Sequence, residues 1–430
     1  MTAGEELYKL VAELYPICRS ITGDGVRRTL EIVDREVGGG LEVTEVPTGT
    51  EVLDWTVPRE WNVRDAWVAD PSGRKVIDFQ ASNLHLVSCS VPVRATVPLA
   101  ELREHLFTLP DQPDRVPYRT AYYAERWGFC ASQRVVDGLA EGDYEVCVDT
   151  TLADGHLTYG ERLIEGQSTD EVLVSCHVCH PSLANDNLSG IAVASRLARL
   201  LAKGPRPRYS YRFLFIPGTI GSITWLARNQ DRLDRVRHGL VLSGLGDPGG
   251  FTWKRSRRGD TVIDRAMAHV LGRSGRPHQL VDFSPYGYDE RQYCSPGFNL
   301  PVGRLSRTPF ATYPEYHTSA DDLDFVGPGQ LADSLEVCQE VVEVLEGDRT
   351  YLNLSPKGEP QLGKRGLYGQ IGGRSDAEER QMAMLWVLNL SDGGMSLLEV
   401  AERAGLPFAL VAEVAGALEA AGLLSRTAGG

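Results

Sequence analysis

The sequence contains no run of about 20 apolar residues, the length that an α-helix needs to span a bilayer. Its first twenty residues have acids where a signal peptide has positive charges, and they contain no continuous apolar stretch. Basic residues are also scarce, with 44 Lys and Arg against 58 Asp and Glu and a net charge of −14. Such a charge repels nucleic-acid phosphates and anionic lipid headgroups. We therefore expect a cytoplasmic protein that binds neither membranes nor nucleic acids.

Cysteine is sparse, with eight residues in a chain of 430. This density excludes a small disulfide scaffold. Only Cys176 and Cys179 lie close together in the sequence, and no second CxxC pair completes a four-thiolate zinc site. Hydrophobic residues make up 42% of the chain, which is enough for sizeable cores and two to four domains.

The first third of the chain contains two predicted helices and then short strands. The helices cover residues 4–15 and 24–33, and Asp24 is the expected cap of the second. The strands are punctuated by Pro, Gly and Trp, which indicates a β-rich insertion. They are predicted at residues 41–46, 66–69, 75–79 and 83–88.

Strands and helices alternate in the middle of the chain, which predicts a mainly parallel sheet flanked by helices. The predicted strands are 144–148, 156–164, 171–176, 209–216 and 239–245. The predicted helices are 188–202, 220–229 and 260–271. Ligands of such sheets bind beyond the carboxyl ends of the strands, so the loops that follow strands are the ones to search for chemistry.

The C-terminal region has the helical spacing of a winged helix, with helices at 377–390, 396–404 and 407–421. Residues 376–430 carry eight acids, three Arg and no Lys. A DNA-reading helix needs basic residues near phosphate. We therefore expect intramolecular packing, a dimer contact or a protein partner here, which leaves homo-oligomer formation open.

One loop that follows a strand holds two histidines and an aspartate, His177, His180 and Asp186, within ten residues. Imidazole nitrogens and carboxylate oxygens suit zinc, and the start of the following helix can bring them together. A simpler interpretation is that Asp186 or Asn187 only caps that helix. Asp247, which follows another predicted strand, is a further candidate ligand.

Two later segments also carry candidate residues. His317 precedes three acids, Asp321, Asp322 and Asp324, which taken alone resemble a solvated helix start. Asp289 and Glu290 are neighbours, and neighbouring side chains on an extended chain point to opposite sides. At most one of the two should therefore face a given site.

Four sequence segments resemble those of a bacterial family of aminopeptidase-like proteins, which is related to the co-catalytic zinc aminopeptidases. They cover Leu14–Asp24, Cys179–Asn185, Asp289–Gly297 and Tyr316–Asp324. The resemblance spans roughly residues 5–425. It implies a zinc-exopeptidase-like core at 1–45 and 120–346, a β-rich insertion at 46–119, a linker at 347–375 and a winged helix at 376–430.

The resemblance also implies site residues. His177 or His180 would be the first metal ligand, Asp186 the carboxylate that bridges two metals, and His317 the late ligand. Cys179 stands where the aminopeptidases have an Asp. Gly218 and Thr219 stand where they have two adjacent glutamates, one a general base and one a metal ligand.

With one ligand missing, we expect one zinc in preference to two, held by His177, His180, Asp186, Asp247 and His317. Glu290 is the predicted replacement for the base, with Glu315 as a weaker candidate. Substrate binding is assigned to Asp289, Arg291 and Tyr316. The expected activity is hydrolysis of an amide bond in a small peptide or an aminoacylated biosynthetic intermediate. The alternative is a degenerate peptidase fold that binds a ligand or a partner.

Overall fold

The computed structural model describes residues 1–367 and 377–427. They divide into two compact units, the first made of residues 1–261 and 277–336 and the second of residues 262–276 and 337–430. None of the helices in these described ranges combines the length and the apolarity required to cross a membrane.

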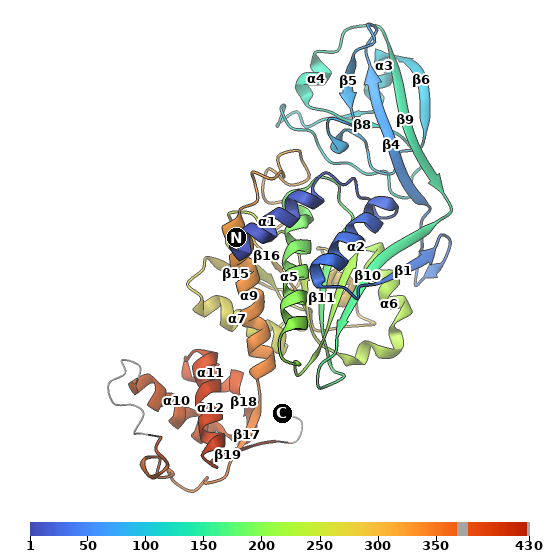
Figure 1. Ribbon diagram of the computed structural model, residues 1–430. Coiled ribbons are helices and arrows are strands. Elements are labelled where there is room, and N and C mark those ends of the chain that lie inside the picture. The colour runs from blue at the N-terminus through green and yellow to red at the C-terminus, as the bar shows by residue number, and fades with distance from the viewer. Residues whose placement is uncertain (368–376, 428–430) are drawn as a thin grey trace. The chain divides into compact units, whose positions relative to one another are not determined.

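The first unit contains an eight-stranded mixed sheet of order β1-β10-β12-β11-β13-β16-β14-β15 (Figure 1). Strands β12, β11, β13 and β16 run parallel, and every residue of β11 and β12 is buried. This confirms the predicted mixed, mostly parallel sheet. The strands are β1 (Glu42–Pro47), β10 (His156–Ile164), β11 (Glu171–His177), β12 (Ser210–Ile216), β13 (Val236–Leu242), β14 (Phe251–Lys254), β15 (His278–Val281) and β16 (Val302–Ser306).

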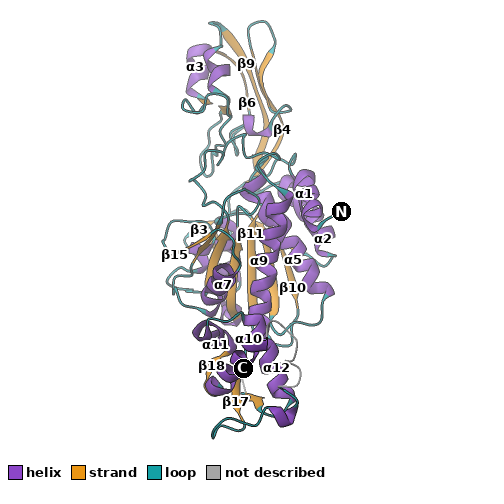
Figure 2. Ribbon diagram, turned by 90° about the vertical axis from the view of Figure 1, so that its left-hand side faces the viewer, coloured by secondary structure: helices purple, strands orange, loops and turns teal. Residues whose placement is uncertain are grey.

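Helix α5 (Gly190–Lys203) packs against β10, β11, β12 and β13, and α1 (Ala3–Leu14) and α2 (Asp24–Val37) pack against α5. Figure 2 shows these three helices on one side of the strands. Asp24 does not cap α2 as expected. The N-cap is Gly23 at a φ of 98°, a conformation that favours glycine, and Asp24 begins the helix.

Four further helices lie wholly or partly in the first unit. Helix α6 (Ile220–Arg228) contacts β10 and the short helix α8 (Glu290–Tyr293), and the 3₁₀ helix η3 (Gln230–Arg235) follows α6. Helix α9 (Pro328–Gly347) begins in the first unit and ends in the second.

The β-rich insertion forms an antiparallel sheet of order β5-β4-β9-β6 with its own apolar cluster. Strand β9 lies beyond residue 119, where the insertion was expected to end, and pairs with β4 along most of its length. The elements are β4 (Glu60–Ala69), β5 (Lys75–Asp78), β6 (Val93–Pro98) and β9 (Asp143–Ala153), with β2 (Glu51–Val52), β3 (Trp55–Thr56), β7 (Leu106–Phe107), β8 (Phe129–Cys130), α3 (Leu99–Glu104) and α4 (Gln133–Asp137).

The prediction of a strand at residues 83–88 is wrong. Residues Asn83–His85 form the 3₁₀ turn η1, and Leu86 and Ser88 make only isolated bridges. Leu84 and Leu86 are buried in two different apolar clusters, so their alternation reflects burial and not strand pairing.

The second unit contains a three-stranded sheet of order β18-β17-β19 with α10, α11 and α12, the predicted winged helix. Strand β17 and the 3₁₀ turn η4 (Gly363–Arg365) fall in the predicted linker, of which residues 368–375 lie outside the described residues. The other elements are α7 (Val262–Arg273), β17 (Thr350–Asn353), α10 (Ala377–Leu390), β18 (Asp392–Ser396), α11 (Leu397–Ala404), α12 (Phe408–Ala420) and β19 (Leu424–Arg426).

Candidate metal centre

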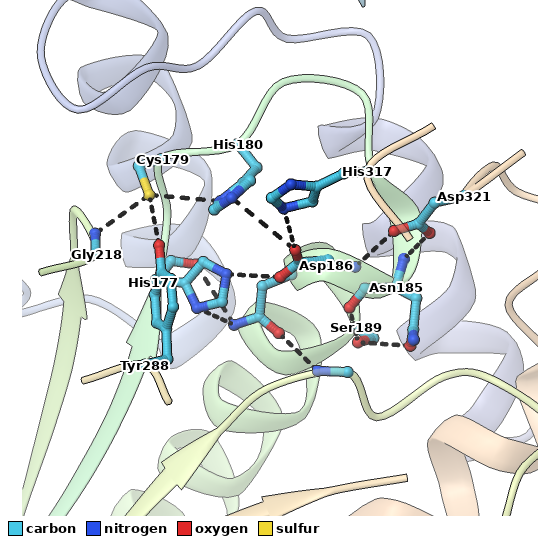
Figure 3. A network of polar contacts seen from close by, with 12 residues as sticks. His177, Cys179, His180, Asn185, Asp186, Ser189, Gly218, Tyr288, His317 and Asp321 are labelled. Carbon is cyan, nitrogen blue, oxygen red and sulfur yellow. Dashed lines mark hydrogen bonds and ion pairs between the residues drawn. The ribbon is translucent and has the colours of Figure 1, made fainter. Parts of the chain in front are cut away.

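His177 is the last residue of β11, and the loop from β11 to α5 folds back so that Asp186 faces it. Nε2 of His177 lies 2.8 Å from Oδ1 of Asp186 (Figure 3). Asn187 does not cap α5, because its amide nitrogen lies 3.3 Å from Nδ1 of His177 and its oxygen accepts from the N–H of Gly244. The capping interpretation of this loop is therefore not what the structure shows.

His317 comes from a distant loop and approaches the other oxygen of Asp186. Its Nε2 lies 3.0 Å from Oδ2 of Asp186. The loop is held by the segment between β7 and β8 of the insertion: the N–H of Tyr118 donates to the carbonyl of His317 at 2.8 Å, and Pro117 forms a β-bridge with Thr318. The insertion thus supports one side of the centre.

His180 completes the cluster, with Nε2 at 3.9 Å from Oδ2 of Asp186. Ligand atoms of His177, His180 and Asp186 all lie within 4.8 Å of one another. Burial lowers the pKa of His180 to about 3, so its ring is neutral, the form that binds metals. Burial would raise the pKa of Asp186, but the surrounding histidines, His180 first, hold it well below its usual value.

Asp321 orients the loop that carries Asp186. Its two carboxylate oxygens accept from the backbone N–H groups of Asn185 and Asp186 at 2.6 and 3.0 Å. The side chain is fully buried, and burial raises its pKa well above the usual value. It was expected to lie in a solvated acidic run. Its position four residues after His317 was the signal that could have linked it to the site.

Asp247 lies next to the cluster but does not join it. Its oxygens accept from the side-chain amide of Asn185 at 3.1 Å, the hydroxyl of Thr308 at 2.5 Å and the N–H of Gly249 at 2.8 Å. Asp247 therefore positions Asn185 and hence the loop, and it makes no contact with the histidines in the described interactions.

Glu290 is completely buried and lies in an ion pair. Its Oε1 is 2.8 Å from Nζ of Lys254 and 3.6 Å from a guanidinium nitrogen of Arg304, and its Oε2 accepts from the N–H of Tyr288. The structure thus places Glu290 in a buried ion pair that holds the 286–290 loop, and no described interaction joins it to the histidines.

Replacement of Glu290 by Gln is expected to lower the free energy of unfolding by about 3–5 kcal/mol, because it leaves the buried Lys254 ammonium without its carboxylate. Zinc content should not change. Urea unfolding and elemental analysis measure the two effects. Glu315→Gln is the control, since the Glu315–Arg115 pair is more exposed and should contribute less than about 1 kcal/mol. Loss of zinc at unchanged stability would instead make Glu290 a ligand.

Of the three predicted substrate-binding residues, Tyr316 contacts a candidate ligand, while Asp289 and Arg291 lie at the short helix α8. One oxygen of Asp289 accepts from the N–H of Thr219 and the hydroxyl of Ser222, and burial raises its pKa to about 6. Its second oxygen is buried and finds no partner among the described residues. Arg291 lies on α8 with a buried Nε. The ring of Tyr316 stacks on His317, with 3.9 Å between the centroids.

Tyr288 fills the space beside Gly218, which the sequence did not reveal. A Cβ added to Gly218 would lie 1.8 Å from the Tyr288 hydroxyl oxygen and 2.3 Å from Cζ. This hydroxyl lies 3.3 Å from Sγ of Cys179, which also accepts from the N–H of Gly218 at 3.2 Å. The Tyr288 ring packs on His177, with 4.1 Å between the centroids. The Tyr288 ring therefore occupies the space into which any side chain at position 218 would extend.

Comparison with known proteins agrees with this architecture. Residues 8–348 match the model of a family described as a domain of unknown function, DUF4910, and residues 349–426 match a winged helix-turn-helix family. A protein from Clostridium acetobutylicum is 51% identical over 415 residues, or 96% of this chain and 95% of that protein. It is named as a candidate polysaccharide biosynthesis protein with an aminopeptidase-like domain.

Solved structures show the same fold. A crystal structure of a candidate peptidase from Clostridium acetobutylicum superposes with a TM-score of 0.94 at 48% identity, covering 99% of this chain and 96% of that one. A zinc aminopeptidase from Bacillus subtilis superposes with a TM-score of 0.58 at 13% identity, covering 80% of this chain and 95% of that one. A peptidase from Shewanella amazonensis superposes with a TM-score of 0.56 at 14% identity, covering 80% of this chain and 93% of that one. The last two similarities show the fold alone.

Proposed function

Because the chain belongs to the DUF4910 family and has the aminopeptidase-like fold with a winged helix, we propose that it is a metal-dependent hydrolase of amide bonds. The 51%-identical relative is named for polysaccharide biosynthesis, which favours a small biosynthetic intermediate over a nutrient peptide as the substrate.

One observation carries this proposal: the carboxylate of Asp186 is shared by imidazoles from two distant loops. Oδ1 faces His177 at 2.8 Å, and Oδ2 faces His317 at 3.0 Å and His180 at 3.9 Å. Imidazoles around one carboxylate are a donor set that zinc accepts.

His177, His180 and Asp186 would hold one divalent ion, with His317 on the opposite oxygen of Asp186. Zinc in this position would supply a Lewis acid that polarises the amide carbonyl. The protein's own part is to orient the ligands through Asp321 and to exclude water with the rings of Tyr316 and Tyr118, which pack on His317 at 3.9 and 5.0 Å.

A second candidate function is ligand binding without turnover. It is favoured by Gly218 and by the Tyr288 hydroxyl in the space where a glutamate side chain would extend. A site without a carboxylate base loses the roughly 10²–10⁴-fold that general base catalysis contributes.

Elemental analysis of protein purified without a histidine tag, with turnover assays on aminoacyl amides, dipeptides and N-acylated amines, tests the proposal. We expect about one equivalent of zinc and turnover that a chelator abolishes and added zinc restores. Less than about a tenth of an equivalent, even after zinc addition, would contradict the metal site. Bound zinc without turnover of any of these amides would favour the ligand-binding function.

A further inference from the structure

A cavity of about 360 Å³ opens on the candidate metal centre, close to the lower end of the volumes typical of small-molecule sites. His180 and His317 line it on the side of the centre, and Tyr288 lines it beside Gly218. The ring of Tyr118 packs on both histidines, with centroids 5.3 Å from His180 and 5.0 Å from His317. Whatever occupies the cavity therefore lies next to the candidate metal ligands.

Aromatic side chains form much of the cavity lining, and three of them, Tyr118, Tyr122 and Tyr123, belong to the segment between β7 and β8 of the insertion. Trp55 of β3 and Tyr123 pack edge to face at 5.6 Å and remain 41% and 57% exposed, while the hydroxyls of Tyr118 and Tyr122 lie 2.9 Å apart. Exposed rings at a cavity offer flat apolar faces with hydrogen-bonding edges. Such faces accept uncharged groups and, by cation–π attraction, ammonium groups, so the charges around the cavity decide between the two.

No Asp, Glu, Lys or Arg is among the described residues that line the cavity. The carboxylates nearby are already engaged: Asp186 faces His177 and His317, and Glu290 is paired with Lys254. An ammonium group that enters such a cavity gives up water without gaining a carboxylate, which costs free energy.

Asp289 and Glu315 do not supply the missing charge. Asp289 has no exposed surface, and its Oδ1 bonds to Thr219 and Ser222. Its Oδ2 has no hydrogen-bond partner among the described residues, but it is fully buried and Asp289 does not line the cavity. Glu315 is paired with Arg115 at 3.1 Å. A divalent cation at the centre would repel an ammonium group further. The free amino end of a peptide, which an aminopeptidase must hold, therefore finds no counter-charge here.

We propose that the group bound in this cavity is uncharged, so that the substrates are N-acylated amines and not peptides or aminoacyl compounds with a free ammonium group beside the scissile bond. This rests on the proposed function and narrows its substrate class. The acyl group lies against Tyr118 and Tyr122 with its amide toward His180 and His317, and Trp55 and Tyr123 cover the entrance.

Equilibrium binding of two matched amides tests this inference. Phenylalaninamide and 3-phenylpropanamide differ only in the amino group, which is protonated at pH 6, below its ordinary pKa of about 8. Calorimetry on the full chain, metal-free and zinc-loaded, should show at least about tenfold tighter binding of 3-phenylpropanamide in both forms. Equal or tighter binding of phenylalaninamide, or no binding of either amide, would overturn the proposal.

Variants locate the binding and test its electrostatic basis. Trp55→Ala should weaken binding of 3-phenylpropanamide about fivefold, whereas Tyr286→Ala, an exposed ring outside the cavity lining, should not. Tyr123→Glu should raise the affinity for phenylalaninamide to that for 3-phenylpropanamide, because it adds a carboxylate to the cavity. Tyr123→Gln, which adds no charge, should not raise it. The affinities of the two amides are also measured in metal-free protein, so their comparison does not depend on zinc or on turnover. Absence of zinc or of turnover would therefore count against the proposed function alone.

Discussion

Asp186→Ala is expected to abolish zinc binding and, with it, chelator-sensitive turnover. Asp186 is the side chain that faces all three histidines, so its loss removes a ligand and the group that orients the others. The affinity for zinc should fall by more than the roughly 10–100-fold that removal of an outer partner of a ligating histidine costs. Zinc titration by calorimetry measures the affinity, and thermal unfolding shows whether zinc still stabilises the fold.

Asp247→Asn is the matched control for this variant. Asp247 is as buried as Asp186 and lies beside the same loop, but its oxygens accept from Asn185, Gly249 and Thr308. The variant should therefore keep its zinc. If Asp186→Ala retained zinc, or Asp247→Asn lost it, the centre would be built from ligands other than the cluster.

Gly218→Ala is expected to lower the free energy of unfolding by about 1–3 kcal/mol, the usual cost of overpacking, because its Cβ would overlap the Tyr288 hydroxyl. Gly218→Glu should cost more. The effect should vanish once the ring is removed, so that Gly218→Ala in a Tyr288→Ala background destabilises the protein no further. Urea unfolding of the four proteins of this double-mutant cycle measures the coupling.

The Tyr288→Ala variant of this cycle also allows a carboxylate to be introduced at position 218. In the Tyr288→Ala background, Gly218→Glu would direct a carboxylate into the space beside His177, at the position where the resemblance to the aminopeptidases implies a general base. We expect turnover to rise by about 10²–10⁴-fold over Tyr288→Ala alone, the usual contribution of a general base. If Gly218→Ala alone proved neutral, the space beside Gly218 would not be reserved for Tyr288 and this design would fail.

The main elements and the centre's position followed from local patterns. The apolar strand before His177 and the helical spacing after Gly190 placed the β11–α5 loop at a strand end, where the ends of parallel strands gather ligands. The prediction that His317 belongs to the same centre also needed the family resemblance. Nothing in the sequence around His317 identifies Asp186, 131 residues earlier, as its partner.

The sequence does not reveal contacts between residues that are distant along the chain. Glu290 pairs with Lys254, 36 residues earlier, at the end of a neighbouring strand. Tyr288 directly precedes Asp289, but its overlap with Gly218 exists only in three dimensions. Asp321 looked like a solvated acid because its partners, two backbone N–H groups, have no signature in the side-chain sequence.

The candidate metal centre and the cavity beside it draw on different parts of the chain. The candidate ligands His177, His180 and Asp186 lie in the core, at the end of β11 and in the loop that follows it, whereas Tyr118, Tyr122 and Tyr123, which line the cavity, lie between β7 and β8 of the insertion. The β-bridge between Pro117 and Thr318 and the bond from Tyr118 to His317 join the two parts. Recombination that exchanged the insertion between relatives would therefore replace these three tyrosines and leave the candidate ligands in place.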